Sequence, residues 1–74
     1  MTRFNQWVKR NAKFVLHKGE KRCIEHVHFH PTPIPNFFEL HFKLTGIPDI
    51  CRDGVNMGEL RRRYNNYVTS KEKR

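Results

Sequence analysis

Three prolines within six residues place a rigid break in the middle of this 74-residue chain. Residues 31–36 (Pro-Thr-Pro-Ile-Pro-Asn) cannot donate a backbone hydrogen bond at the three proline positions. Such a segment cannot continue a β-ladder along its length, so it is expected to connect two elements. A chain of this length has a single core, and the loop is therefore expected to join two strands of one domain rather than two domains.

The segment after the prolines has the clearest strand pattern. In residues 37–44 apolar side chains alternate with polar ones, which is typical of a strand with one buried face. Residues 21–30 predict a second strand before the prolines, and residues 13–17 predict a shorter one. Between these two lies Lys18-Gly19-Glu20, whose composition favours a turn. Three strands are therefore expected.

A helix is predicted at each end of the chain. In residues 2–12 the apolar side chains recur at helical spacing, with Thr2 placed to cap the first turn. A second helix is predicted from Met57 onward, where Asn56 and Glu59 fit a capping box in its asparagine variant. Its apolar stripe is expected to contain Met57, Leu60, Tyr64, Tyr67 and Val68.

These elements predict one small α+β domain over residues 1–74, in the order α-β-β-β-α. We expect a two-layer structure in which both helices pack on one face of a three-stranded antiparallel sheet. Residues 45–56 contain glycine, proline and aspartate and are expected to form a loop. Residues 70–74 are expected to form a frayed basic tail.

The two central strands predict a face rich in histidine. Pairing Phe29 with Phe38 would bring the apolar residues of both strands onto one face and would set His26 opposite His41. The other face would then carry Ile24, His26, His28, His30, Glu39, His41 and Lys43.

Two interpretations of this face stay open. Histidines that alternate along a strand lie about 6–7 Å apart on one side, and the group of His26, His28, His30 and His41 with Glu39 could therefore bind zinc, with His26, His28 and His41 as the candidate ligands. Cys23 and Cys51 do not form the closely spaced pair of a zinc finger, which argues against a structural zinc site. Otherwise the face is a surface whose positive charge rises below about pH 6.5, as imidazoles protonate.

The charge of the chain is concentrated at its two ends. The net charge is +6 over residues 1–22, −3 over residues 23–60 and +5 over residues 61–74, which gives +8 in total. Such a balance favours polyanionic partners, because binding releases the counterions of phosphate groups. We therefore expect a nucleic-acid-binding protein that contacts RNA or the phosphate backbone rather than a base sequence. The expected binding residues are Arg61, Arg62, Arg63, Asn66, Lys9, Arg10, Lys13 and Lys18.

Two other functions are alternatives. A small basic protein of phage or mobile-element type could act as an inhibitor or adaptor that docks on a larger host protein. An exposed apolar patch in the loops would favour this interpretation, and its candidate residues are Ile34, Phe37, Ile47 and Ile50. A small ribonuclease could use histidines as acid and base, although no glycine-rich nucleotide loop, nucleophile elbow or carboxylate pair is present.

The sequence also predicts where the protein is found. No segment approaches the roughly 18 apolar residues of a membrane span. Arg3, Lys9 and Arg10 interrupt the region where a signal peptide would need an apolar stretch. An intracellular protein of the cytoplasm is expected, in which Cys23 and Cys51 are free thiols.

The order of elements resembles the double-stranded-RNA-binding fold, and within it the HicA-type mRNA interferase toxins. In that family the last helix begins with a Gly-x-Leu-Arg segment after a proline-containing loop, and Gly58-Glu59-Leu60-Arg61 after Ile47-Pro48 looks similar. Lys18-Gly19 stands where the family has Gly-Ser-His, but Glu20 and Lys21 occupy the positions of the serine and the catalytic histidine. The resemblance therefore implies RNA binding without the family's catalytic residues.

Overall fold

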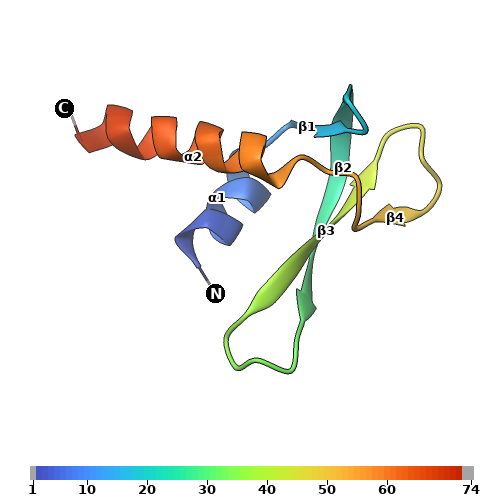
Figure 1. The fold of residues 1–74 in the computed structure, drawn as a ribbon, viewed down its shortest axis with the longest axis horizontal. Coiled ribbons are helices and arrows are strands. Elements are labelled where there is room, and N and C mark those ends of the chain that lie inside the picture. The colour runs from blue at the N-terminus through green and yellow to red at the C-terminus, as the bar shows by residue number, and fades with distance from the viewer. Residues whose placement is uncertain (1, 73–74) are drawn as a thin grey trace.

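Two helices and four strands make up this computed structural model, which describes residues 2–72 (Figure 1). The elements are α1 (Arg3–Asn11), β1 (Phe14–His17), β2 (Glu20–Pro31), β3 (Phe38–Leu44), β4 (Ile50–Cys51) and α2 (Met57–Glu72). The sheet is antiparallel, with the strand order β1-β2-β3-β4. The fold is therefore α+β as predicted, but the predicted three-stranded sheet is wrong.

The missing strand lies in the segment 45–56, which was predicted to be a loop. Ile50 pairs with Lys43 and Cys51 pairs with Phe42, so that β4 extends the sheet beyond β3. Cys51 is buried in the core, which fixes this short pairing. A strand of two residues is too short to show an alternating pattern in the sequence.

After β4 the chain returns to the other edge of the sheet. Val55 forms an isolated bridge with His17 at the end of β1. The backbone N–H of Lys18 donates to the carbonyl of Gly54, and that of Asn56 donates to Leu16, each over 2.9 Å. These bonds fix the point at which α2 begins.

Both helices begin with the expected N-cap residue, but only one half of the predicted capping box forms, because the Asn56 N–H donates to Leu16 and the Glu59 carboxylate pairs with Arg63. The Thr2 hydroxyl accepts the backbone N–H of Asn5 over 3.1 Å, and the Asn56 side-chain oxygen accepts that of Glu59 over 3.0 Å. Each cap satisfies one of the donors that the first turn of a helix leaves unpaired. The helix ends could be predicted because these contacts are local.

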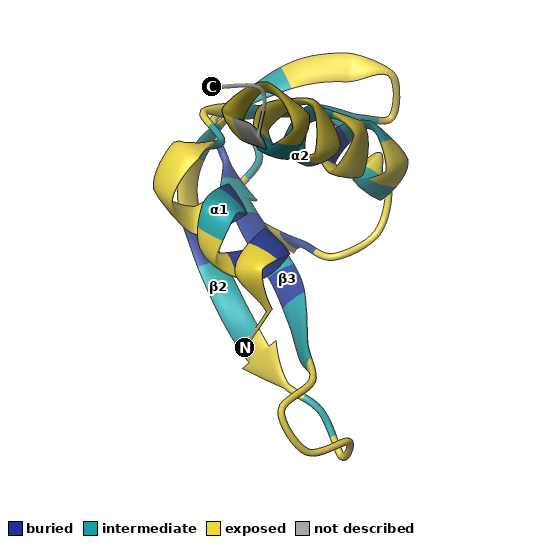
Figure 2. Cartoon of the chain, turned by 90° about the vertical axis from the view of Figure 1, so that its left-hand side faces the viewer, coloured by how far each residue is buried: buried dark blue, intermediate teal, exposed yellow. Residues whose placement is uncertain are grey.

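Both helices contribute to one core against the sheet. Figure 2 shows α1 lying across β2 and β3, with the buried residues between them, while α2 lies beside α1. Phe42, Leu44, Leu60, Val8 and Val15 are the largest fully buried side chains. Only the first part of α2 reaches this core, because Leu60 is its one fully buried residue among those described. The rest of α2 extends past the sheet (Figure 1).

The register of β2 and β3 differs from the predicted one by two residues. Phe29 pairs with Leu40 rather than with Phe38, and His26 pairs with Lys43 rather than with His41. A shift by two keeps each side chain on its predicted face, so the histidines still share one side of the sheet. In this register Pro31 pairs with Phe38, so the connecting loop covers residues 32–37 instead of the predicted 31–36.

One residue changes face because of an irregularity in β2. The ladder is shifted between Ile24 and His26, which leaves Glu25 without a partner in β3. An extra residue of this kind reverses the alternation of side chains. Ile24 therefore pairs with Leu44 and packs against the core instead of lying on the histidine face as predicted.

Several other expectations concern the whole chain. Within residues 2–72, neither helix combines the length and the apolar sequence that a membrane crossing requires. Cys23 and Cys51 are free thiols, as expected. The predicted frayed tail falls partly outside the described residues, since α2 continues to Glu72 and residues 73–74 are not described.

Candidate functional site

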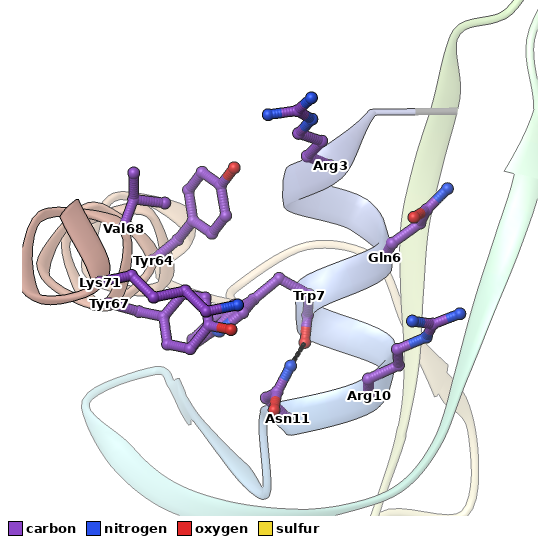
Figure 3. A pocket seen from close by; sticks show the side chains of 9 residues that line it. All are labelled: Arg3, Gln6, Trp7, Arg10, Asn11, Tyr64, Tyr67, Val68 and Lys71. Atoms are coloured by element: carbon purple, nitrogen blue, oxygen red, sulfur yellow. Dashed lines mark hydrogen bonds between the residues drawn. The ribbon is translucent and has the colours of Figure 1, made fainter. Parts of the chain in front are cut away.

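A groove with a volume of about 660 Å³ lies between α1 and α2 (Figure 3). Figure 3 views α2 almost end-on beside α1, with Trp7, Tyr64 and Tyr67 between the two helices, whereas Gln6 and Arg10 project from the side of α1 away from α2. The groove is lined from α1 by Arg3, Gln6, Trp7, Arg10 and Asn11 and from α2 by Tyr64, Tyr67, Val68 and Lys71.

Aromatic side chains hold the two helices together along this groove. The Trp7 ring contacts those of Tyr64 and Tyr67, with centroid distances of 5.7 and 5.9 Å. Tyr64 also meets Phe4 edge to face at 5.6 Å. Such tilted pairs bind more strongly than apolar burial alone would provide. Tyr67 remains 40% exposed, so part of this aromatic surface is open to a ligand.

Three cationic side chains lie around the aromatic rings of the groove. Arg3 and Arg10 stand on α1, one turn to either side of Trp7, and Lys71 approaches from α2. All three are exposed. The Lys71 ammonium lies 5.4 Å from the centre of the Tyr67 ring. None of the described residues that line the groove is acidic, so an anion here would meet attraction from the cations of both helices.

Polar groups complete the lining. The Asn11 side chain donates to the Trp7 carbonyl over 3.1 Å, which leaves its oxygen available as an acceptor, and Gln6 is exposed. The indole N–H of Trp7 is buried and has no hydrogen-bond acceptor among the described residues. A buried donor without an acceptor costs free energy, so the N–H group of Trp7 lowers the stability of the fold although its ring packs well.

The predicted binding residues of the first half of the chain lie in two places. Arg10 lines the groove. Lys9, which precedes it in α1, does not line the groove, and its ammonium lies 5.0 Å from the centre of the Phe29 ring. Lys13 and Lys18 are exposed but do not line the groove. Lys18 lies in the turn between β1 and β2, where its N–H bonds to Gly54.

The three predicted arginines of α2 point in different directions. Arg61 stacks on Phe4, with 4.3 Å between the guanidinium carbon and the ring centre. Arg63 is half-buried: it stacks on Phe14 at 4.2 Å and donates to the Phe14 carbonyl over 2.8 Å. Its Nε also lies 2.7 Å from the Glu59 carboxylate.

Arg62 and Asn66 are exposed, and neither lines the groove. The structure therefore places one predicted residue, Arg10, in the groove, and gives Arg63 a set of contacts within the fold.

Most of the groove was missed from sequence, although a signal was present. Trp7, Tyr64 and Tyr67 were assigned to the apolar stripes of their helices, and Arg3 was not selected. On α1, however, Arg3, Trp7 and Arg10 follow the spacing of one helical face. A face that alternates cationic and aromatic residues differs from an ordinary core stripe, and this pattern could have been found.

A second surface is apolar and lies at the tip of the β2–β3 hairpin. Ile34 and Phe37 are both exposed there, joined by a hydrogen bond from the Phe37 N–H to the Ile34 carbonyl over 3.2 Å. The Thr32 hydroxyl lies 3.3 Å from the Ile34 carbonyl and 2.8 Å from the Phe37 carbonyl and stabilises the turn. Of the other loop candidates, Ile50 is exposed, whereas Ile47 packs against the core.

The histidine face forms two separate pairs. His26 and His28 meet edge to face at 4.4 Å, and His30 stacks on His41 at 4.5 Å. The predicted metal trio of His26, His28 and His41 is therefore divided between the pairs. The two-residue difference in register is the reason, since it moves His41 from His26 to a position opposite His28.

No family model, no curated protein and no solved structure matches this chain. The resemblance to the double-stranded-RNA-binding fold and to the HicA-type toxins therefore stays a prediction.

Proposed function

We propose that this protein binds nucleic acid through the groove between α1 and α2. The observation that carries the proposal is the lining itself: three cations and three aromatic rings line one groove, with no acidic side chain among its described lining residues. Proteins that bind single strands combine these two features, because cations contact the phosphates while bases stack on aromatic rings.

The groove supports specific roles for its side chains. Arg3, Arg10 and Lys71 would contact phosphates from both sides, and arginine can do so with two parallel hydrogen bonds. The exposed part of Tyr67 would stack on an unpaired base. The amides of Gln6 and Asn11 would hydrogen-bond to the sugar or a base edge. These contacts tolerate many sequences, in keeping with the backbone recognition expected from the charge.

The ribonuclease alternative predicts histidines as acid and base, and no histidine is among the described residues that line the groove. The five histidines of the chain lie on β1, β2 and β3. The ribonuclease alternative therefore gains no support from the groove.

The test measures binding of purified protein to labelled single- and double-stranded RNA and DNA over a series of salt concentrations. Wild type is expected to prefer single strands, with an affinity that falls steeply as salt rises. Replacing Arg10 and Lys71 with glutamine is expected to weaken binding and to reduce the log-log salt slope by about 1–2, at about 0.7 for each lost phosphate contact.

The matched control changes the same charge outside the groove. Lys13 and Lys18 replaced together by glutamine also remove two positive charges, but they are expected to leave the affinity within a few-fold of wild type. Equal losses in the two double variants would show a general attraction to positive charge and would refute the groove as the site.

The apolar hairpin tip supports a second candidate function, docking on a larger protein. Two exposed apolar residues held in one turn are the kind of anchor that fills a pocket at a protein interface. Replacing Ile34 and Phe37 with serine should abolish capture of a host protein that wild type retains, while the Arg10 and Lys71 double variant still captures it. If the groove variant no longer captured the host protein while the hairpin variant still did, docking through the hairpin tip would be refuted.

A further inference from the structure

We infer that His30, Glu39 and His41 form a binding site for a divalent transition metal of the zinc type. The site lies on strands β2 and β3 and shares no residue with the groove, so it is independent of nucleic-acid binding. It also differs from the trio predicted from sequence, of which it contains only His41.

The sheet brings the three side chains together. His30 on β2 pairs directly with Glu39 on β3, and His41 follows Glu39 by two residues on the same face. The His41 Nε2 lies 3.3 Å from a Glu39 carboxylate oxygen, and the His30 ring stacks on His41 with only 13° between their planes. One potential ligand atom from each residue lies within 4.8 Å of the other two.

This set of ligands fits zinc. Two imidazoles and one carboxylate form a three-ligand set that holds zinc with a water molecule in the fourth position. Zinc bonds of about 2.0–2.1 Å place tetrahedral ligand atoms about 3.3 Å apart. The present separations of up to 4.8 Å exceed this by about 1.5 Å at most. Rotation of the side chains is enough to close this difference, and the paired strands need not move.

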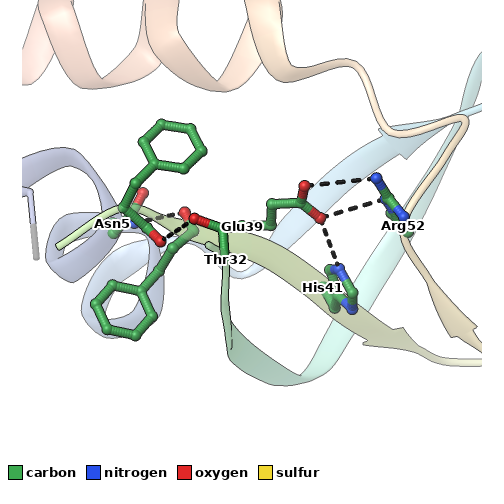
Figure 4. Close-up of polar contacts among 7 residues, drawn as sticks. Asn5, Thr32, Glu39, His41 and Arg52 are labelled. Atoms are coloured by element: carbon green, nitrogen blue, oxygen red, sulfur yellow. Dashed lines mark hydrogen bonds and ion pairs between the residues drawn. The ribbon is translucent and has the colours of Figure 1, made fainter. Parts of the chain in front are cut away.

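Arg52 currently occupies the carboxylate. Its Nε lies 3.3 Å from one Glu39 oxygen and its terminal nitrogen 3.4 Å from the other (Figure 4). The Arg52 side chain is 65% exposed, so it can turn into solvent, whereas His41 is only 16% exposed and stays in place. A metal would therefore compete with Arg52 for Glu39, so that removal of Arg52 is expected to strengthen metal binding.

The test is titration of the purified wild-type protein with Zn²⁺ by calorimetry and with Co²⁺ by visible absorption, after removal of any tag. We expect one ion per chain and a Co²⁺ spectrum with nitrogen and oxygen ligands. Glu39→Gln, His30→Gln and His41→Gln should each weaken binding at least about tenfold, as loss of a metal contact commonly does. Arg52→Gln should strengthen it, because a competing cation is removed.

The other histidine pair provides the control. A His26→Gln and His28→Gln double variant removes two imidazoles from the same face and should leave the affinity within about threefold of wild type. Equal loss in this variant, several weak sites per chain, or weaker binding in Arg52→Gln would overturn the site. Circular dichroism of each variant verifies the fold, and the exposed His30 keeps the test valid if His41→Gln unfolds.

Discussion

Three consecutive arginines on α2 have three different surroundings. Successive side chains on a helix point about 100° apart, since a turn takes 3.6 residues. Arg61 lies on Phe4, Arg63 lies on Phe14, and Arg62 is exposed. The basic run itself could be seen in the sequence. The contact of Arg63 with Phe14 could not, because the two residues are 49 positions apart.

The contacts of Arg63 predict a role in stability. Arg63→Gln removes the stacking on Phe14, the bond to its carbonyl and the ion pair with Glu59, and is expected to lower the free energy of unfolding by about 1–3 kcal/mol. Arg62→Gln is the matched control and should change it by less than about 0.5 kcal/mol. Urea unfolding followed by circular dichroism measures both, and similar values would contradict the assigned role.

Substitutions of Trp7 separate the contribution of its ring to stability from that of its N–H group. Trp7→Phe keeps an aromatic ring against Tyr64 and removes the buried donor that has no acceptor. We expect stability within about 1 kcal/mol of wild type, because the lost packing is offset by the removed penalty. Trp7→Ala should lose more than about 2 kcal/mol. Thermal unfolding of the two variants measures this difference, and a Trp7→Phe protein as unstable as Trp7→Ala would show that the N–H group is satisfied.

The strands and helices differ in how far they could be predicted. Both helix caps and the alternation of β3 depend on neighbouring residues, and both are confirmed. The register of β2 against β3 depends on where the ladder shifts at Glu25 and on how many residues the proline loop takes up. β4 exists only because the edge of β3 is there to pair with it. Neither property is encoded in a local pattern.

Two glycines on either side of β1's end, Gly19 in the β1–β2 turn and Gly54 in the segment that returns to β1, give a prediction for thermal stability. Gly19 and Gly54 both have a φ of +83°, where a side chain costs about 1–2 kcal/mol. At Gly54 an added Cβ would also lie 3.1 Å from the His17 ring, while at Gly19 nothing lies within 4 Å. Gly54→Ala should therefore lower the melting temperature more than Gly19→Ala. Equal decreases in melting temperature for the two variants would show that backbone strain alone, and not the contact with His17, causes the loss.

At the scale of the whole molecule, the two helices that meet each carry part of one basic end of the sequence, with Arg3, Lys9 and Arg10 on α1 and Arg61, Arg62, Arg63 and Lys71 on α2. The charge balance predicted a polyanion as partner, and Figure 1 shows that α1 and α2 lie next to each other although the sheet separates them in sequence. Which cations converge could not be predicted, because that depends on how α2 is turned against α1. Contacts among Trp7, Tyr64 and Tyr67 set that orientation.

A ligand held by both helices should stabilise the entire fold. A single-stranded oligonucleotide at 100 times its Kd is expected to raise the free energy of unfolding by about 2.7 kcal/mol. The Arg10→Gln and Lys71→Gln double variant should lose most of this gain, and the Lys13→Gln and Lys18→Gln control should keep it. Thermal unfolding with and without the oligonucleotide measures the effect. Equal gains in both variants would place the ligand elsewhere.

The position of the groove walls in the chain has a consequence for synthesis. A ribosome makes α1 first, then all four strands, and α2 last. The wall that carries Tyr64, Tyr67 and Lys71 therefore leaves the exit tunnel after the rest of the domain. Until then the nascent chain has the basic first helix but no groove. The groove proposed to bind nucleic acid therefore cannot form until α2 has been made.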